Sequence, residues 1–295
     1  DTDKDEISLG HAHKFGFDTI HGSLDNYFEL MDFVRLNDLT DSENYEYVTS
    51  KIDIKNLQET FITQIFLANS DWPHHNNRFW QINNPESRWR WIFFDLDAAF
   101  KSSVYDNFGF IFQPELEASQ FTEPEDYELI NYLMQNQTFA LSFRNKMYEL
   151  LDNVFAPERT VPILENLISR LEPEMENHIR RWNFPRSPER WQKDLGDIKD
   201  FLVRRPHYLN GALAQRLGMP IKTFPNPAES FLNIELELSE NQEVKSELIN
   251  VAGAVFPISK QYLTSGKHLV QMDIPKQLST GTYCLKVRTK RRVFT

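Results

Sequence analysis

The spacing of apolar positions predicts a chain that is mainly helical up to about residue 218. Apolar side chains recur at helical spacing from residue 23 to 36, with Ser23 as the expected N-cap, and again from about residue 56 to 68. From residue 126 the pattern is helical throughout, with predicted helices at residues 126–136, 138–154, 158–178 and 188–216. Several prolines separate these segments.

A β-hairpin interrupts the helical part. Two short runs, residues 78–82 and 88–94, are rich in aromatic and β-branched residues and are separated by Asn, Pro, Glu and Ser, which are turn residues. If the second strand stays extended to its end, Trp89, Trp91, Phe93 and Asp95 share one face, and Asp97 continues it. The hairpin would therefore present acidic side chains at its end.

Beyond Pro220 the pattern changes to strict alternation. Polar side chains alternate with apolar ones from residue 231 to 238, and similar strands are predicted at residues 244–251, 268–272 and 282–288, with glycines between them. This pattern is typical of a small antiparallel sandwich. We therefore predict an α+β chain with a domain at residues 1–218 and a β-sandwich domain at residues 219–295.

The distribution of charge supports this division into two domains and makes some classes of function less suitable than others. The formal net charge is −11; residues 219–295 carry 10 basic and 7 acidic side chains, so they hold +3 and residues 1–218 hold −14. An acidic chain is unsuited to a broad nucleic-acid surface, whereas an acidic pocket suits a divalent metal. Cys284 is the only cysteine, which excludes an intrachain disulfide. No apolar run approaches the length of a membrane span.

The candidate chemistry lies between residues 71 and 97. Asp71 follows a predicted helix, Asn76 comes five positions later, and the hairpin then leads to Asp95 and Asp97. This is the order of the phosphoryl-transfer site of protein kinases, where a loop Asp accepts the proton of the attacking hydroxyl and an Asn and a second Asp hold Mg²⁺ on the phosphates of ATP. Hard oxygen ligands favour magnesium over zinc. We expect Asp71 to be the base, and Asn76, Asp95 and Asp97 to lie at the metal.

Four segments resemble the spore coat protein H (CotH) kinase family. They are residues 37–48, 65–73, 89–97 and 173–182, and the similarity extends over roughly residues 20–210. The distinctive part is Asn-Ser-Asp-Trp-Pro at residues 69–73 together with Asp-Leu-Asp at residues 95–97. The resemblance implies an ATP- and Mg²⁺-dependent kinase acting on Ser or Thr of secreted or coat proteins, with an atypical kinase-like C-lobe, Asp71 as the catalytic residue and Asp95 on magnesium.

One part of the kinase pattern is missing ahead of Asp71. The sequence has neither a glycine-rich loop nor a strand Lys paired with a helical Glu in that region. The chain also begins without Met, in a charged stretch. We expect the nucleotide-clamping N-lobe to precede residue 1, and an intact parent protein to carry any activity.

The C-terminal part resembles the sorting domain of type IX secretion cargo. The resemblance rests on residues 223–236, which open with Pro-Asn-Pro-Ala, on the turn at residues 250–253, and on Gly-Thr-Tyr-Cys-Leu-Lys-Val at residues 281–287. It implies an immunoglobulin-like sandwich, interaction with the type IX secretion machinery, and a protein that is secreted or held at the cell surface. An extracellular or surface protein would then be the substrate.

Two other functions are compatible with the sequence. An apolar strand that ends in Asp95-Leu96-Asp97 also occurs in haloacid-dehalogenase-type phosphatases, but the Thr usual two places later is Ala99 here, and the motif does not open a parallel sheet. A scaffold that keeps the kinase fold without catalysis is the other alternative. Nucleotide binding would separate it from a kinase.

Three further groups of residues are assigned structural roles. The vicinal pair His74 and His75 is unsuited to a shared metal and is expected to be solvated. All six Trp residues lie between residues 72 and 191, where core or rim packing is the expected role. The basic pairs at residues 180–181 and 204–205 are expected on solvated or salt-bridged helix faces.

Overall fold

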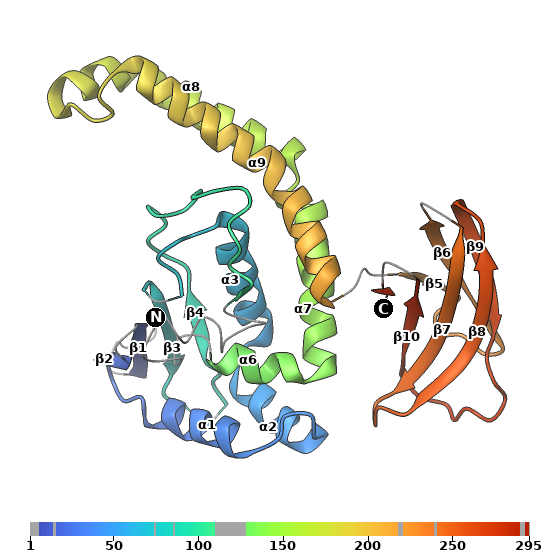
Figure 1. Cartoon of the computed structure of the whole chain (residues 1–295). Helices are drawn as coiled ribbons and strands as arrows, with labels where there is room; N and C mark the ends of the chain where they lie inside the picture. Colours follow the sequence, from blue (N-terminus) through green and yellow to red (C-terminus); the bar gives the residue numbers. More distant parts are fainter. Residues whose placement is uncertain are drawn as a thin grey trace. The chain divides into compact units, whose positions relative to one another are not determined.

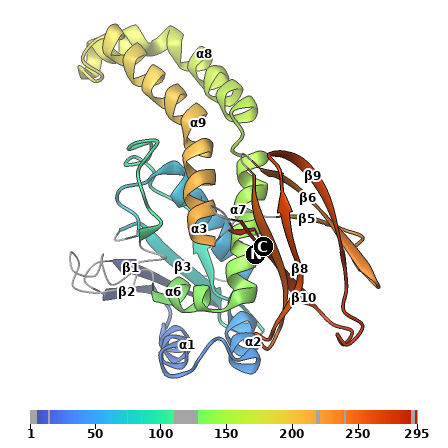
Figure 2. The ribbon, with the colours of Figure 1, turned by 45° about the vertical axis from the view of Figure 1, so that its right-hand side comes forward.

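The computed structural model describes residues 6–13, 16–73, 75–84, 86–109, 128–217, 221–238, 241–289 and 293–294. The chain divides into two compact units, residues 1–210 and 211–295. Figures 1 and 2 show a first unit built mainly of helices around a small sheet and a second unit built of strands. This combination of helices and antiparallel sheets agrees with the predicted α+β class.

The first unit contains a four-stranded antiparallel sheet and, in its described part, helices that separate and follow the strands. The sheet order is β2-β1-β3-β4. The elements in chain order are β1 (Ile7–His13), β2 (Gly16–His21), α1 (Asp25–Leu36), α2 (Ser42–Lys51), α3 (Ile54–Leu67), β3 (Asn77–Ile82), β4 (Arg90–Ile92), α6 (Glu128–Gln135), α7 (Gln137–Asp152), α8 (Pro157–Trp182) and α9 (Pro188–Leu217).

The predicted helices and the hairpin β3–β4 are confirmed, with boundaries shifted by a few residues. The sequence analysis had assigned neither the hairpin β1–β2 nor α2. It also placed the N-cap of α1 one residue early: Leu24 is the N-cap, and the Ser23 Oγ accepts a hydrogen bond from the Asp25 N–H at 3.0 Å. Since Leu24 is itself buried, the start of α1 is set by packing as well as by capping.

One face of the sheet packs against α1 and α3 through aromatic rings. Phe79 of β3 stacks on Tyr27 of α1 with ring centroids 4.1 Å apart, and Trp91 of β4 lies edge-on to Phe61 of α3. Gly10 of β1 faces the same layer, and a Cβ added there would come within 2.6 Å of the Phe79 ring. The aromatic core therefore requires glycine at this position of β1.

The helices α8 and α9 form a long antiparallel pair (Figures 1 and 2). Lys199 of α9 and Glu165 of α8 form an ion pair between them. Toward its C-terminal end α9 becomes buried, at Phe201, Leu202 and Arg205, which brings it against the end of α3. The pair is thus anchored where the candidate site begins.

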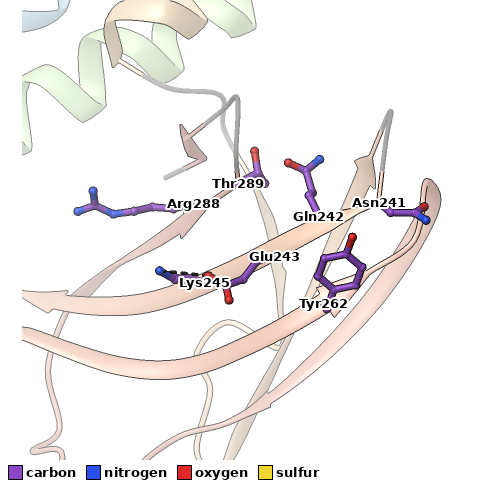
Figure 3. A pocket seen from close by; sticks show the side chains of 7 residues that line it. All are labelled: Asn241, Gln242, Glu243, Lys245, Tyr262, Arg288 and Thr289. Atoms are coloured by element: carbon purple, nitrogen blue, oxygen red, sulfur yellow. Dashed lines mark ion pairs between the residues drawn. The ribbon is translucent and has the colours of Figure 1, made fainter.

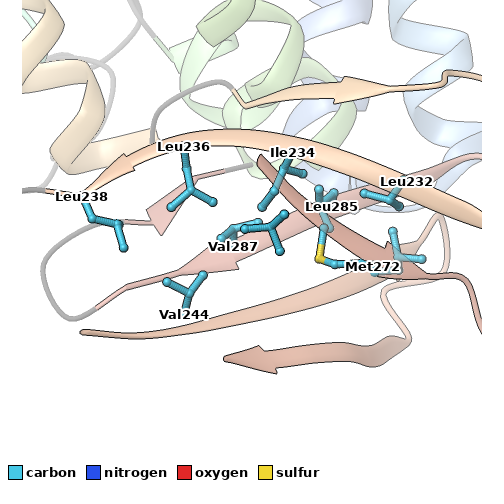
Figure 4. Packing of buried hydrophobic residues seen from close by; sticks show 10 residues of the cluster. Leu232, Ile234, Leu236, Leu238, Val244, Met272, Leu285 and Val287 are labelled. Carbon is cyan, nitrogen blue, oxygen red and sulfur yellow. The ribbon is translucent and has the colours of Figure 1, made fainter. Parts of the chain in front are cut away.

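The second unit is a sandwich of two antiparallel sheets with an apolar interior. Their strand orders are β5-β6-β9 and β11-β10-β7-β8. Figure 4 shows the side chains of Ile234, Met272 and Val287 among those that meet between the strands, all buried. The strands are β5 (Lys222–Phe224), β6 (Phe231–Leu238), β7 (Gln242–Asn250), β8 (Val255–Leu263), β9 (Gly266–Asp273), β10 (Tyr283–Arg288) and β11 (Val293–Phe294).

Alternation along β6 is as predicted, because Leu232, Ile234, Leu236 and Leu238 are all buried. The turn at residues 250–253 is also confirmed: the Gly253 N–H donates to the Asn250 carbonyl at 2.9 Å, and Gly253 has a φ of 79°. The strand β8, which pairs with β7, was not predicted, since its alternation is broken by Pro257 and by a register shift in the pairing.

Candidate functional site

The candidate site is formed by two segments that lie side by side: residues 69–73 and 75–76 after α3, and residues 95–100 after β4. The Ser70 N–H donates to the Ala98 carbonyl at 3.1 Å, and the Phe100 N–H donates to the Leu67 carbonyl at 2.7 Å. Farther along, the Asn76 Nδ2 donates to the Asp95 carbonyl at 3.3 Å. The fold thus brings the predicted site residues of the loop and of the strand end onto adjoining segments.

Asp71 stands at the tip of a loop whose next residue is anchored in the core. Its side chain is exposed, whereas Trp72 is buried edge-on against Phe61 of α3 with ring centroids 4.9 Å apart. The Asp71 carbonyl accepts a hydrogen bond from the His75 N–H at 2.7 Å, which closes a turn. The carboxylate is therefore presented to solvent from a fixed backbone.

Buried polar side chains hold this loop from behind. The Asn69 Oδ1 accepts the Asp71 N–H at 3.2 Å, and the Asn69 Nδ2 donates to the Gln64 Oε1 at 3.0 Å. The Asn69 carbonyl in turn accepts from the Asn107 Nδ2 at 3.2 Å, and the Asn107 Oδ1 accepts from the Arg205 Nη2 at 3.3 Å. A continuous chain of hydrogen bonds therefore runs from α9 to the backbone of Asp71.

Arg205 is fully buried and is the centre of this network. Its guanidinium donates to the carbonyls of Ile65 and Phe66 at the end of α3, at 2.6 and 3.1 Å, and to those of Ser103 and Tyr105, at 3.0 and 2.6 Å. Burial lowers the pKa of the Arg205 guanidinium to about 10, so it remains charged at neutral pH. The sequence-based assignment of Arg205 to a solvated or salt-bridged face is wrong.

Arg204, by contrast, is exposed and lies 3.8 Å from Asp200, as expected. The two arginines differ because α9 turns by about 100° per residue, which places neighbours on different faces. Only the face toward α3 meets the carbonyls at the C-terminal end of that helix, which can accept further hydrogen bonds. Composition alone does not reveal which of two adjacent arginines occupies that face.

The strand that leads to Asp95 is held by an asparagine of α3. The Asn56 side chain accepts the Trp91 N–H at 2.5 Å and donates to the Trp91 carbonyl at 3.2 Å. Because β4 is an edge strand, these groups would otherwise lack a partner on that side. Asn56 therefore substitutes for a missing neighbouring strand.

The expected common face from Trp89 to Asp95 does not occur. Trp89 and Trp91 are buried, but β4 ends at Ile92, Phe93 is exposed, and Asp95 has a φ of 53°. A left-handed residue breaks the alternation of an extended chain, so strand parity no longer applies. Asp95 and Asp97 are both exposed, on a segment that is pinned by the bonds to Ser70 and Asn76.

The described residues hold no group of three or more His, Cys, Asp or Glu side chains placed to bind a metal. The predicted magnesium ligands differ from such a group because one of them is an amide. The Asn76 Nδ2 donates to the Asp95 carbonyl, and its Oδ1 has no hydrogen bond from a described residue. The assignment of Asn76, Asp95 and Asp97 to magnesium, and of Asp71 to proton transfer, stays a prediction.

Basic side chains lie next to these acids, on the sheet face opposite to α1. His11 of β1 is the cross-strand partner of Arg78 of β3. Burial lowers the pKa of the His11 imidazole, and the positive charge of Arg78 adds to the effect. His75 is exposed, as expected, whereas His74 lies outside the described residues. The sequence analysis missed His11 and Arg78, because only strand pairing places them together.

The second unit has a surface hollow of its own, which belongs to a different part of the chain. It has a volume of about 540 Å³ and is lined by residues that include Lys245, Tyr262 and Arg288 (Figure 3). The Glu243 carboxylate in it is paired with Lys245 at 3.1 Å and with Lys260 at 2.9 Å. The charged Glu243 in this hollow is therefore already paired with lysines of the sheet surface.

Comparison with known families identifies the protein family to which the chain belongs. The family described as CotH kinase protein matches residues 13–209, which include the strands β2, β3 and β4, the candidate site and α9 up to Leu209. The chain belongs to this CotH kinase family. The resemblance of its loop and hairpin motifs to that family is thereby confirmed.

The CotH domain is followed by a second matched domain. Residues 222–295 match the secretion system C-terminal sorting domain, and this confirms the second resemblance. The sorting domain points to export of the protein and to interaction with the secretion machinery. No curated protein and no solved structure matches the chain. Across the described residues, the helices are too short or too polar to cross a bilayer.

Proposed function

We propose that this protein is an exported kinase of the CotH type that transfers the γ-phosphoryl group of ATP to Ser or Thr hydroxyls of an extracellular or surface protein. The observation that carries the proposal is the hydrogen bond from the Asn76 side chain to the Asp95 carbonyl, 3.3 Å long. It joins the loop of Asp71 to the segment of Asp95 in a chain that belongs to the CotH family. The order and the proximity of these groups follow the phosphoryl-transfer pattern.

The side chains near this bond fit a magnesium ion. Asp95, Asp97 and the free Oδ1 of Asn76 offer hard oxygen donors, and the two carboxylates are exposed and need no rearrangement to bind a hydrated ion. Bound Mg²⁺ would neutralise the charge of the transferring phosphates. Asn76 and Asp95 would hold the ion, and Asp97 would assist from the same segment.

The exposure of Asp71 and its fixed backbone support a role in accepting the proton of the attacking hydroxyl. Its carboxylate is exposed, so a Ser or Thr side chain of a protein can reach it, and its backbone is fixed by Asn69 and by the buried ring of Trp72. A fixed carboxylate orients the hydroxyl and accepts its proton as the oxygen attacks phosphorus. The exposure also favours a macromolecular acceptor over an enclosed small molecule.

The finer description of the two domains follows the same proposal. The helical unit would be the C-lobe of an atypical kinase, and the tail an immunoglobulin-like sandwich that the type IX secretion machinery recognises. Seven strands in two antiparallel sheets, within the described residues, suit such a sandwich. The protein would then act as a secreted or surface-attached enzyme.

Replacement of the two central acids tests the activity. Asp71→Asn and Asp95→Ala should each lower phosphoryl transfer from radiolabelled ATP by about 100-fold or more, because proton transfer and metal binding are lost separately. Asp32→Asn, which changes an exposed Asp of α1 paired with Arg35, is the matched control and should keep the normal rate. Transfer at the normal rate by either site variant would refute the assignments.

A non-catalytic scaffold is the second candidate. It is favoured by the observation that no three acidic or histidine side chains among the described residues converge as a metal site. Thermal unfolding with ATP and Mg²⁺ distinguishes the two functions, because a ligand at 100 times its Kd stabilises a protein by about 2.7 kcal/mol. Absence of stabilisation would favour the scaffold. The phosphatase alternative gains no support, since β4 belongs to an antiparallel sheet.

A further inference from the structure

The sheet of the CotH domain has a second face that differs in chemistry from the aromatic one. Along β1 and β3 the burial alternates, so that Ala12, Asn77 and Phe79 face the core. His11 and Arg78 point to the opposite, half-buried face. His13 lies two residues beyond His11 and therefore shares that face. The basic side chains of His11, His13 and Arg78 thus lie together on the side of the sheet that α1 does not cover.

This cluster of His11, His13 and Arg78 extends to the candidate site. The guanidinium of Arg78 lies over the ring of Phe94, 4.4 Å from its centroid, and Phe94 directly precedes Asp95. The rings of His11 and His13 are 5.4 Å apart. Arg78 is also only two residues beyond Asn76 in the chain. The cluster therefore lies beside the acids proposed to hold magnesium.

Arg78 lacks a close polar partner for its side chain among the described residues. Its Nε is shielded from solvent and has no hydrogen-bond partner among the described residues, and the Nε2 of His11 is in the same condition. The nearby carboxylate of Asp18 is 3.2 Å from the Nε2 of His13 and is engaged there. A half-buried cation without a counter-ion costs desolvation energy that an anionic ligand would recover.

We propose that Arg78 and His11 form a phosphate-binding subsite on this half-buried face of the sheet, adjoining the acidic segments at Asp71 and Asp95. The inference rests on the proposed function. It assigns to these two residues the binding of a phosphate group, either of the nucleotide or of the phosphorylated product. A guanidinium recognises phosphate through paired N–H donors in one plane. The ring of Phe94 holds that plane in place by stacking, and His11 supplies an additional N–H donor from the neighbouring strand.

The phosphate has two possible sources with the same chemistry. It belongs either to the nucleotide or to the phosphorylated side chain of the protein product. Both would be drawn to a cationic site on a chain whose formal charge is otherwise −11. A purely structural Arg78, stacked on Phe94 alone, would need no anion, and removal of its charge would leave ligand binding unchanged.

Equilibrium binding to the full 295-residue chain tests the subsite without turnover and without metal. ADP and phosphoserine are titrated separately in the presence of EDTA, and ³¹P line broadening or calorimetry gives each Kd. Arg78→Gln should weaken binding of the preferred ligand by about 10- to 100-fold, as expected for loss of a charged hydrogen-bond donor. His11→Gln should weaken it less, and Arg78→Lys should retain part of the affinity, because the charge remains and the planar fork is lost.

Arg90→Gln is the matched control. Arg90 is an arginine of β4 in the same sheet, stacks toward the ring of Trp80, and has its own carboxylate partner, Asp53, at 3.2 Å. Its replacement should leave both Kd values within about twofold of the unmodified protein, since its charge is already paired. Tryptophan fluorescence during urea unfolding verifies that each variant is folded. If Arg78→Gln does not fold, the binding affinity of Arg78→Lys tests the subsite instead.

The outcomes separate this inference from the proposed function. Tighter binding of ADP assigns the subsite to the nucleotide, and tighter binding of phosphoserine assigns it to the product. If Arg78→Gln binds both as the unmodified protein does, if Arg90→Gln weakens binding equally, or if the unmodified protein binds neither ligand, the subsite is refuted. Phosphate binding through Arg78 in a protein that transfers no phosphate would refute the kinase and leave the subsite intact.

Discussion

Replacement of the buried Arg205 by Met probes the network that supports the candidate site. Met preserves much of the aliphatic volume but removes the guanidinium, whose five hydrogen bonds reach four backbone carbonyls and the Asn107 side chain. A hydrogen bond from a charged donor contributes about 1.5–3 kcal/mol, and a buried acceptor left without a partner costs about 1–3 kcal/mol. The lowered pKa of about 10 corresponds to roughly 3 kcal/mol of unfavourable burial of the guanidinium charge, a cost that Met does not carry.

The net effect is smaller than these bonds taken one by one. They share a single side chain, and the Ile65 carbonyl keeps a hydrogen bond from the Ala68 N–H at 3.2 Å. We therefore expect the free energy of unfolding of the CotH domain to fall by about 3–5 kcal/mol. With a urea dependence of roughly 2 kcal/mol per molar, the midpoint of unfolding would fall by about 1.5–2.5 M.

Tryptophan fluorescence is the suitable assay, because all six Trp residues lie between residues 72 and 191 and the sorting domain contains none. The signal therefore follows the CotH domain even if the two units unfold separately. Arg204→Met is the matched control: its side chain is 71% exposed, and its contact with Asp200 at 3.8 Å contributes at most about 1 kcal/mol. Equal midpoints for the two variants would refute the role given to Arg205.

Three further predictions concern other parts of the chain. Asn56→Ala should lower the free energy of unfolding of the CotH domain by about 1–3 kcal/mol, since the Trp91 N–H and carbonyl lose their partners, and urea unfolding followed by Trp fluorescence measures it. Ile234→Ala should destabilise the sorting domain by about 2–5 kcal/mol in calorimetry while the Trp transition stays in place. Because the pKa of His11 is lower in the folded chain than in the unfolded chain, the unfolded chain binds a proton more readily below pH about 6.5, and the free energy of unfolding should fall as the pH falls through that range. His11→Gln should reduce this pH dependence. An unchanged pH dependence in that variant would contradict the pKa shift.

Much of the secondary structure was predictable from local pattern. The four helices between residues 126 and 217 follow from apolar spacing and from the prolines between them, and β6 follows from alternation that matches burial residue by residue. The hairpin β3–β4 follows from two short strands around turn residues. These signals are contained within a few neighbouring residues, and local physics is sufficient to express them.

The short elements were harder to predict from the sequence. The hairpin β1–β2 is formed around His and Gly residues with weak strand preference, and its stability comes from pairing with β3, about 70 residues later in the chain. The parity expected from Trp89 to Asp95 was wrong for a similar reason. A left-handed residue at Asp95 interrupts the strand, and the bonds that hold it there come from Asn76 and from the loop after α3.

The sequence by itself determined which residue types the candidate site contains and in what order, because Asp71, Asn76, Asp95 and Asp97 stand in a spaced pattern that can be read along one line. Only the tertiary structure decided which side chains support them. Arg205 reaches α3 from about 140 positions away, and Arg78 meets His11 across a strand pair. Whether an arginine is solvated or buried depends on carbonyls and rings that distant segments bring to it, and no local pattern encodes that meeting.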